Sequence, residues 1–112
     1  MEPLTPAVFH ILLSLVDGEK HGYAIMQEVA ERTDNTLVMG PGTLYGTLKR
    51  MLEAQLVEES GERPDPRLDD QRRRYYRLTR QGKRAAEQEA ERLEALVRAA
   101  RAKSLLKRPQ RA

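Results

Sequence analysis

The chain is short, highly charged and slightly basic, and these properties limit what it can be. Its 112 residues are enough for one domain, with 39% hydrophobic and 33% charged residues and no tryptophan. It has no cysteine, which excludes disulfides, thiolate metal sites and cysteine nucleophiles. Residues 1–54 carry a net charge of −3 and residues 55–112 carry +6. This basic second half fits a polyanionic partner, or equally a solvated surface.

The first predicted helix covers residues 4–16 and is apolar almost all round. Thr5 is its expected N-cap, Pro6 fits the first turn, and Gly18 follows its end. One side should face its own domain, and the other should face a partner chain. His10 lies in this apolar run and is expected to be a packed or partly exposed side chain rather than a ligand or base.

A second helix is predicted over residues 21–32, with an apolar stripe that includes Tyr23 and Val29 and has Ile25 beside it. Gly22 should permit a close crossing with the first helix. Residues 33–40 interrupt the pattern and form the next connection, in which Val38 could act as an anchor.

The third predicted helix begins at Pro41 and ends near Ala54. Its apolar stripe consists of Leu44, Leu48, Met51 and Leu52. The other residues are hydroxyl-bearing, aromatic, cationic or glycine, a set that suits phosphate oxygens and base edges. The alternative interpretation is a surface helix whose polar side only keeps the protein in solution.

Two strands follow. The first is predicted over residues 56–60, and residues 61–70 are predicted as a loop because they contain glycine and prolines. The second strand is predicted over residues 71–78. Alternation places Arg74, Tyr76 and Leu78 on one face, directed inward by Leu78. The opposite face carries Arg73, Tyr75 and Arg77.

Thr79 should cap a long last helix that continues to about Ser104, a length of about 39 Å. Its apolar residues follow heptad-type spacing, and nothing in so small a domain could cover the outer half. Docking on a second copy is therefore expected rather than a free helix. The residues predicted at the dimer interface are Leu4, Phe9, Leu12, Ala86, Ala90, Leu93, Leu96, Val97 and Ala100.

The predicted order of elements is three short helices, a β-hairpin and a long helix. It describes a mainly α fold with a small hairpin, a winged helix-turn-helix followed by a dimerisation helix. The predicted domains are residues 1–78 for DNA binding, residues 79–106 for dimerisation, and residues 107–112 as a basic, disordered tail. In this fold the third helix enters the major groove and the hairpin reaches the adjacent backbone. Free N–H groups at that helix's start favour phosphate.

Three separated motifs resemble the PadR family of transcriptional regulators. They are Gly22-Tyr23-Ala24-Ile25, then Gly42-Thr43-Leu44-Tyr45 with Leu48 and Arg50, and then residues 73–79 with Gly82. The resemblance covers roughly residues 4–100 and implies a dimeric repressor whose first and last helices form the dimer. It also implies that Tyr23, Thr43, Tyr45 and the arginine-rich strand lie at or near DNA. The predicted DNA-contacting residues are Tyr23, Gly42, Thr43, Tyr45, Thr47, Lys49, Arg72, Arg73 and Arg74.

Within the second motif, Gly46 stands where the family often has proline or another side chain. The short C-terminal region resembles the compact form of the family, with a single long terminal helix. Some members of that group bind flat aromatic ligands between two tryptophans at the dimer interface. This chain has no tryptophan, so that mode of binding is not carried over.

The predicted function is a sequence-specific regulator of transcription, a repressor that binds double-stranded DNA at an inverted repeat as a homodimer. A small-molecule effector would occupy the dimer interface, between the first and last helices. The alternative is a winged-helix module that binds proteins. An enzyme is not expected, since the sequence has no nucleophile–base pair, clustered metal ligands or cofactor motif. No signal peptide or membrane-spanning run is apparent, so a cytoplasmic protein without membrane association is expected.

Overall fold

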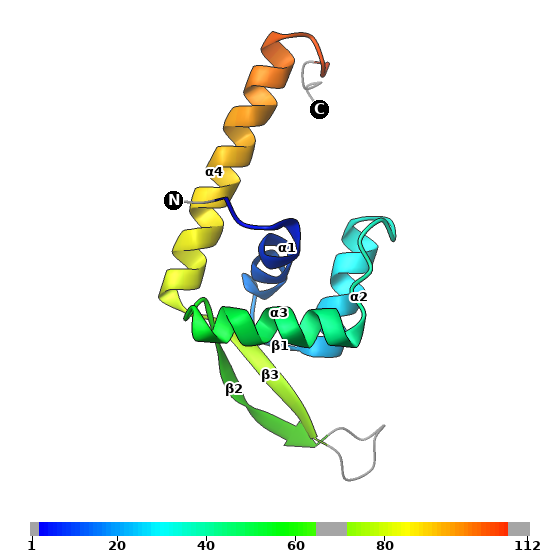
Figure 1. The fold of residues 1–112 in the computed structure, drawn as a ribbon, viewed down its shortest axis with the longest axis vertical. Coiled ribbons are helices and arrows are strands. Elements are labelled where there is room, and N and C mark those ends of the chain that lie inside the picture. Colours follow the sequence, from blue (N-terminus) through cyan, green and yellow to red (C-terminus); the bar gives the residue numbers. More distant parts are fainter. Residues whose placement is uncertain (1–2, 65–71, 108–112) are drawn as a thin grey trace.

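A computed structural model describes residues 3–64 and 72–107 of the chain. It has the predicted fold, a mainly helical domain with a small antiparallel sheet of strand order β1-β3-β2 (Figure 1). The elements are α1 (Pro6–Leu15), β1 (Lys20–His21), α2 (Gly22–Arg32), α3 (Pro41–Glu53), β2 (Val57–Pro64), β3 (Arg72–Leu78) and α4 (Arg80–Ala102).

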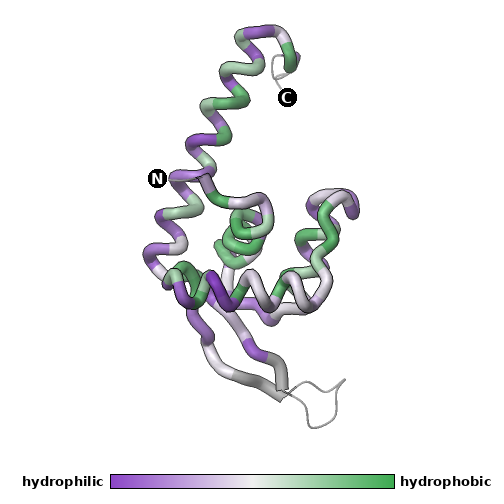
Figure 2. The backbone as a smooth tube through the Cα atoms, in the orientation of Figure 1, coloured by the Kyte–Doolittle hydropathy of each residue, from purple (hydrophilic) through white to green (hydrophobic). Residues whose placement is uncertain are grey.

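The core lies where α1, α2 and α3 meet the base of the sheet, and it is built from aliphatic side chains. α1 supplies much of it, and its apolar segment runs through the middle of the domain in Figure 2. The predicted stripe of α3 is confirmed, because Leu44, Leu48 and Met51 are buried and Leu52 packs against them. One face of α3 is thereby fixed inward, and the opposite face is turned to solvent.

The helix starts follow the predicted capping chemistry. Thr5 Oγ1 accepts a hydrogen bond from the backbone N–H of Val8 at 3.2 Å, and Thr79 Oγ1 accepts one from Gly82 at 2.9 Å. The cap of α2 is a histidine, since His21 Nδ1 accepts from the N–H of Ala24 at 3.1 Å.

Two predicted placements near α2 are wrong. Ile25 and Val29 are fully buried, whereas Tyr23 remains 44% exposed, so the core stripe of α2 is rotated away from the predicted one. In the connection to α3, Met39 is buried and Val38 is 66% exposed. The core therefore selects the longer, unbranched side chain of Met39 as the anchor.

The sheet also differs from its prediction. β2 continues to Pro64, so residues 61–64 are strand rather than loop, and residues 65–71 lie outside the described part. An irregularity in the pairing falls between Glu59 and Gly61, where Gly61 has a φ of +118°. Glycine accepts this backbone conformation, and β2 is an edge strand, where proline is tolerated. The two-residue strand β1 was not predicted.

α4 divides into a packed half and a projecting half (Figure 1). Its buried residues are Gly82, Ala85, Ala86 and Glu89, all in the first three turns. Beyond them the helix extends away from the domain and gives the chain its long dimension of 55 Å. The helix ends at Ala102, close to its predicted end, and the tail after Lys107 lies outside the described residues.

Two residues predicted at the dimer interface are buried within their own protomer. Leu12 is fully buried, and Ala86 is 8% exposed in the same core. The physical reason is that α1 turns Leu12 inward beside Ile11, while the start of α4 packs on the domain. These two side chains are not available to a partner.

Among the described residues, no helix combines the length and hydropathy that a membrane span requires.

Candidate nucleic-acid interface

The exposed face of α3 is the centre of the candidate interface. Thr43 and Lys49 are exposed, as predicted for residues off the apolar stripe. Gly42 and Gly46 lie one turn apart on the side opposite the buried leucines. The N-cap, Gly40, makes no side-chain capping bond. The first amides of α3 therefore point outward without a side-chain partner, in an arrangement that suits a phosphate.

Thr47 was predicted on this outward face, and that prediction is wrong. The residue is only 2% exposed. Its hydroxyl donates to the carbonyl oxygen of Thr43 at 2.7 Å and accepts from Nη2 of Arg50 at 3.3 Å. A threonine hydroxyl in a helix can hydrogen-bond to the carbonyl oxygen four residues earlier, which lets the side chain be buried in the core. Thr47 supports Arg50 instead of facing solvent.

Arg50 is the exposed cation that the sequence prediction left out of the site. Within the part of the chain that the structure describes, neither Lys49 nor Arg50 forms an ion pair. Arg50 lies one turn after Gly46, and its helical position off the apolar stripe had placed it on the polar face, although not among the predicted contacts. The two cations give the outward face of α3 a positive charge.

Tyr45 lies at the edge of this face, against the start of α2. It is 46% exposed. A Cβ atom placed on Gly22 would lie 2.5 Å from the Tyr45 hydroxyl oxygen and 2.8 Å from Cζ. Gly22 is therefore required by Tyr45 of α3, not by the predicted crossing with α1. The contact places Tyr45 against Gly22, the residue that precedes the half-exposed Tyr23.

The hairpin of β2 and β3 forms the wing of the fold. It is joined to the start of α2 by β1, which pairs with β3. His21 pairs with Tyr75 across the strands, and their rings meet edge to face with centroids 5.4 Å apart. On β3, the buried Tyr76 has its pKa raised, mainly by burial and then by the charge of Glu59. Of the predicted inward face of β3, Tyr76 is buried and Leu78 packs against the core, whereas Arg74 is exposed.

The structure describes the side chain of one of the three predicted wing arginines and only the backbone of the other two. The Arg74 side chain is 61% exposed and lies 3.6 Å from a carboxylate oxygen of Glu59. The backbones of Arg72 and Arg73 pair with Pro64 and Arg63, and their side chains lie outside the described part. β3 runs between the hairpin end and the domain core (Figure 1), and its first three residues, at the hairpin end, are arginines.

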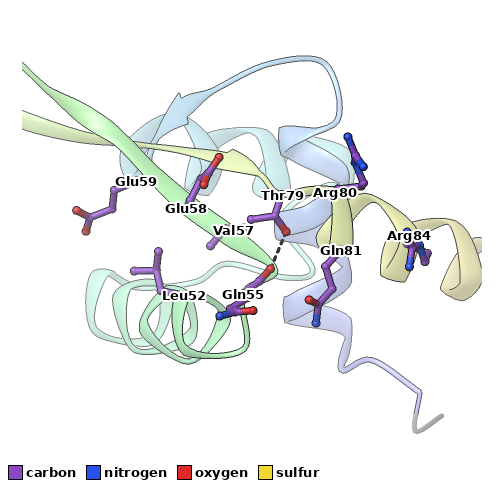
Figure 3. A pocket seen from close by; sticks show the side chains of 9 residues that line it. All are labelled: Leu52, Gln55, Val57, Glu58, Glu59, Thr79, Arg80, Gln81 and Arg84. Carbon is purple, nitrogen blue, oxygen red and sulfur yellow. Dashed lines mark hydrogen bonds between the residues drawn. The ribbon is translucent and has the colours of Figure 1, made fainter.

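A cavity of about 820 Å³ lies where the end of α3, β2 and the start of α4 meet. Its lining includes Leu52 and Val57, with Gln81 at one side (Figure 3). The Thr79 hydroxyl donates to the carbonyl oxygen of Gln55 at 2.6 Å beside it. The sequence did not predict this cavity, which requires the contact between α4 and the turn after α3.

Among the residues that the structure describes, no cluster of three or more potential metal-ligating side chains occurs.

This arrangement agrees with the comparison to known families. The sequence model of the transcriptional regulator PadR-like family matches residues 11–88. The chain belongs to the PadR family. This family is one of transcriptional regulators.

Individual proteins are similar to this chain over most of its length. A PadR family transcription regulator from Clostridium difficile superimposes with a TM-score of 0.73 at 26% identity, covering 88% of this chain and 97% of that one. An uncharacterized protein from Lysinibacillus sphaericus is 32% identical over 74 residues, which is 65% of this chain. An uncharacterized 37.1 kDa transposon protein from Streptomyces fradiae is 38% identical over 80 residues, or 71% of this chain. The matches span 64% and 21% of those two relatives.

Proposed function

We propose that this PadR protein is a repressor that binds an inverted-repeat operator as a homodimer. The observation that carries the proposal is the two-sided character of α3. One side is fixed in the core by Leu44 and Leu48, and the other presents Thr43, Lys49 and glycines to solvent. A helix held this way in a winged helix-turn-helix can enter the major groove with its backbone close to the bases.

The proposed contacts divide by chemistry. Gly42 and Thr43 would meet phosphate at the start of α3, and Lys49 would add charge further along. Tyr45 would contact sugar, phosphate or a base edge, with Tyr23 next to it. The three wing arginines, Arg72, Arg73 and Arg74, would contact the backbone beyond the groove. Thr47 is not among them, because it is buried.

The homodimer is supported by the apolar surface on the projecting half of α4. Leu93, Leu96 and Val97 are 36%, 55% and 37% exposed, respectively. The remaining proposed interface residues are Ala90 and Ala100 of α4, Phe9 of α1 and Leu4 before α1. Leu13 of α1, which the sequence analysis omitted, is 40% exposed and lies one turn after Phe9. Burying such a stripe against a second copy removes it from water and stabilises the dimer.

An ion pair on α4 fixes the N-terminal segment beside the proposed interface. Glu89 is 6% exposed and contacts Arg92 through two hydrogen bonds, of 3.0 and 2.5 Å. A carboxylate oxygen of Glu89 also accepts from the backbone N–H of Leu4 at 3.4 Å. Hydrogen bonding by Arg92 lowers the pKa of Glu89, so the carboxylate stays ionised and fixes Leu4 beside α4.

The proposal is tested by selecting duplexes from a randomised library and measuring affinity by gel shift across salt concentrations. We expect an inverted repeat with half-sites about 34–36 Å apart and a steep loss of affinity as salt rises. Sedimentation of the same protein should give a dimer. If no duplex is enriched and affinity is independent of salt, the alternative of a protein-binding module replaces this function.

Repression and release require separate measurements. A reporter placed behind the selected operator should be silenced by the wild-type protein and restored when Leu96→Glu disrupts the proposed dimer. The effector expected at the dimer interface stays a prediction. Titrating candidate small molecules against the protein–operator complex tests it, with release of DNA as the expected result.

A further inference from the structure

The guanidinium of Arg50 is directed back along the outward face of α3. Its Nη2 donates to Thr47 Oγ1 at 3.3 Å, and that oxygen is itself fixed on the Thr43 carbonyl at 2.7 Å. Side chains on a helix lean toward its N-terminus, and an extended arginine spans more than one turn. The charged end of Arg50 therefore lies near the middle of α3, although its Cα is near the C-terminal end.

Gly46 leaves the space that this arginine uses. A Cβ atom on Gly46 would have Nη1 of Arg50 as its nearest neighbour, at 3.9 Å. A β-carbon alone is compatible with that distance, but a longer side chain would extend into the space beside the guanidinium. The glycine thus permits both a close approach of the helix to DNA and the present position of Arg50.

We propose that Arg50 is a specificity-determining residue that contacts a guanine in the major groove. Gly46 leaves the space over which the Arg50 side chain lies, and Thr47 holds the guanidinium by a hydrogen bond. The proposal deepens the proposed function and rests on it. A guanidinium offers two parallel donors that match O6 and N7 of guanine. Arg50 fits this role because the only described hydrogen bond of its guanidinium is to a neutral hydroxyl, so no carboxylate competes with the base.

The first test uses the duplex selected by the wild-type protein. Arg50→Ala should lose roughly ten- to a hundredfold affinity for it and should tolerate every base at one position per half-site. Replacing the guanine at that position by 7-deazaguanine should weaken the wild-type protein and leave the variant unchanged. The slope of affinity against salt should stay the same, since no phosphate contact is removed.

The matched control is Lys49→Ala, the adjacent exposed cation. It should weaken all duplexes alike and reduce the salt slope by about one phosphate contact. If Arg50→Ala behaves in that way, or binds like the wild type, the base contact is refuted while the repressor function stands. If the wild-type protein selects no duplex at all, the proposed function itself fails.

The second test concerns the gap at Gly46. Gly46→Leu should fill it, displace the guanidinium and lose the same base preference as Arg50→Ala. The double variant should then bind no worse than Arg50→Ala alone, because both changes remove one interaction. Additive losses would mean that the leucine merely collides with DNA, which overturns the role of Gly46. Thermal unfolding of each variant shows whether the fold is retained.

Discussion

Gly82 lies where the start of α4 packs on the turn after α3, and its replacement by alanine should be destabilising. A Cβ at this position would lie 1.9 Å from the carbonyl oxygen of Leu56, about 1.5 Å short of an ordinary 3.4 Å contact. The neighbour is backbone, so no rotamer change can relieve the collision. The two segments must separate, and the hydrogen bonds between them must lengthen.

The expected loss can be worked from these contacts. Overpacking of this kind costs about 1–3 kcal/mol, and weakening the Thr79 cap costs about 1 kcal/mol more. The higher helix propensity of alanine returns about 1 kcal/mol. We therefore expect Gly82→Ala to lower the free energy of unfolding by about 1–3 kcal/mol, or Tm by roughly 5–20 °C in a small domain.

The assay is thermal and urea unfolding at a single protein concentration, because a dimer's Tm depends on concentration. Gly46→Ala is the matched control, since its nearest atom is 3.9 Å from the added carbon. It should be neutral or raise stability by about 0.5–1 kcal/mol. A Gly82→Ala protein that unfolds at or above the wild-type temperature would refute the steric argument.

Three further predictions follow from other contacts. Gly22→Ala should displace the Tyr45 ring and weaken operator binding by on the order of tenfold, with little change in Tm, measured by gel shift and thermal unfolding. Leu96→Glu should convert the dimer into monomers in sedimentation, because the charge would be buried at the interface. Burial, and then Arg32, lower the pKa of His10, so its protonation opposes folding. Stability should fall as pH drops below about 6.5, and this decline in the urea midpoint should be smaller in His10→Asn.

The sequence predicted the helices and their caps well because those signals are local. Thr5 and Thr79 each precede a helix with the chemistry that caps it, and the α3 stripe recurs at helical spacing. The long α4 was predicted to within a turn at its end for the same reason. Such features depend on residues three or four positions apart, which a sequence displays directly.

Two of the features that the sequence missed depend on contacts between distant segments. Gly22 was assigned to a helix crossing, whereas the structure shows Tyr45 occupying the space it leaves. Gly61 suggested a loop, although in pairing with β3 it accommodates a strand irregularity. In both cases the deciding partner lies outside the window in which periodicity is assessed. Thr47 was missed for another reason: it is polar, yet it is buried because Thr43 and Arg50 of the same helix satisfy its hydroxyl.

The joint around Gly82 also determines how the dimer could set the distance between two recognition helices. α3 ends at Glu53, and the turn after it is held on the first turn of α4 by Thr79, which donates to Gln55 at 2.6 Å and to Leu56 at 3.2 Å. Few residues separate the end of α3 from this contact, so a change in the direction of α4 should move α3 with it. In the proposed dimer, the angle between the two α4 helices would then fix the spacing of the half-sites. Gly82→Ala should accordingly weaken binding to the full inverted repeat more than binding to a single half-site.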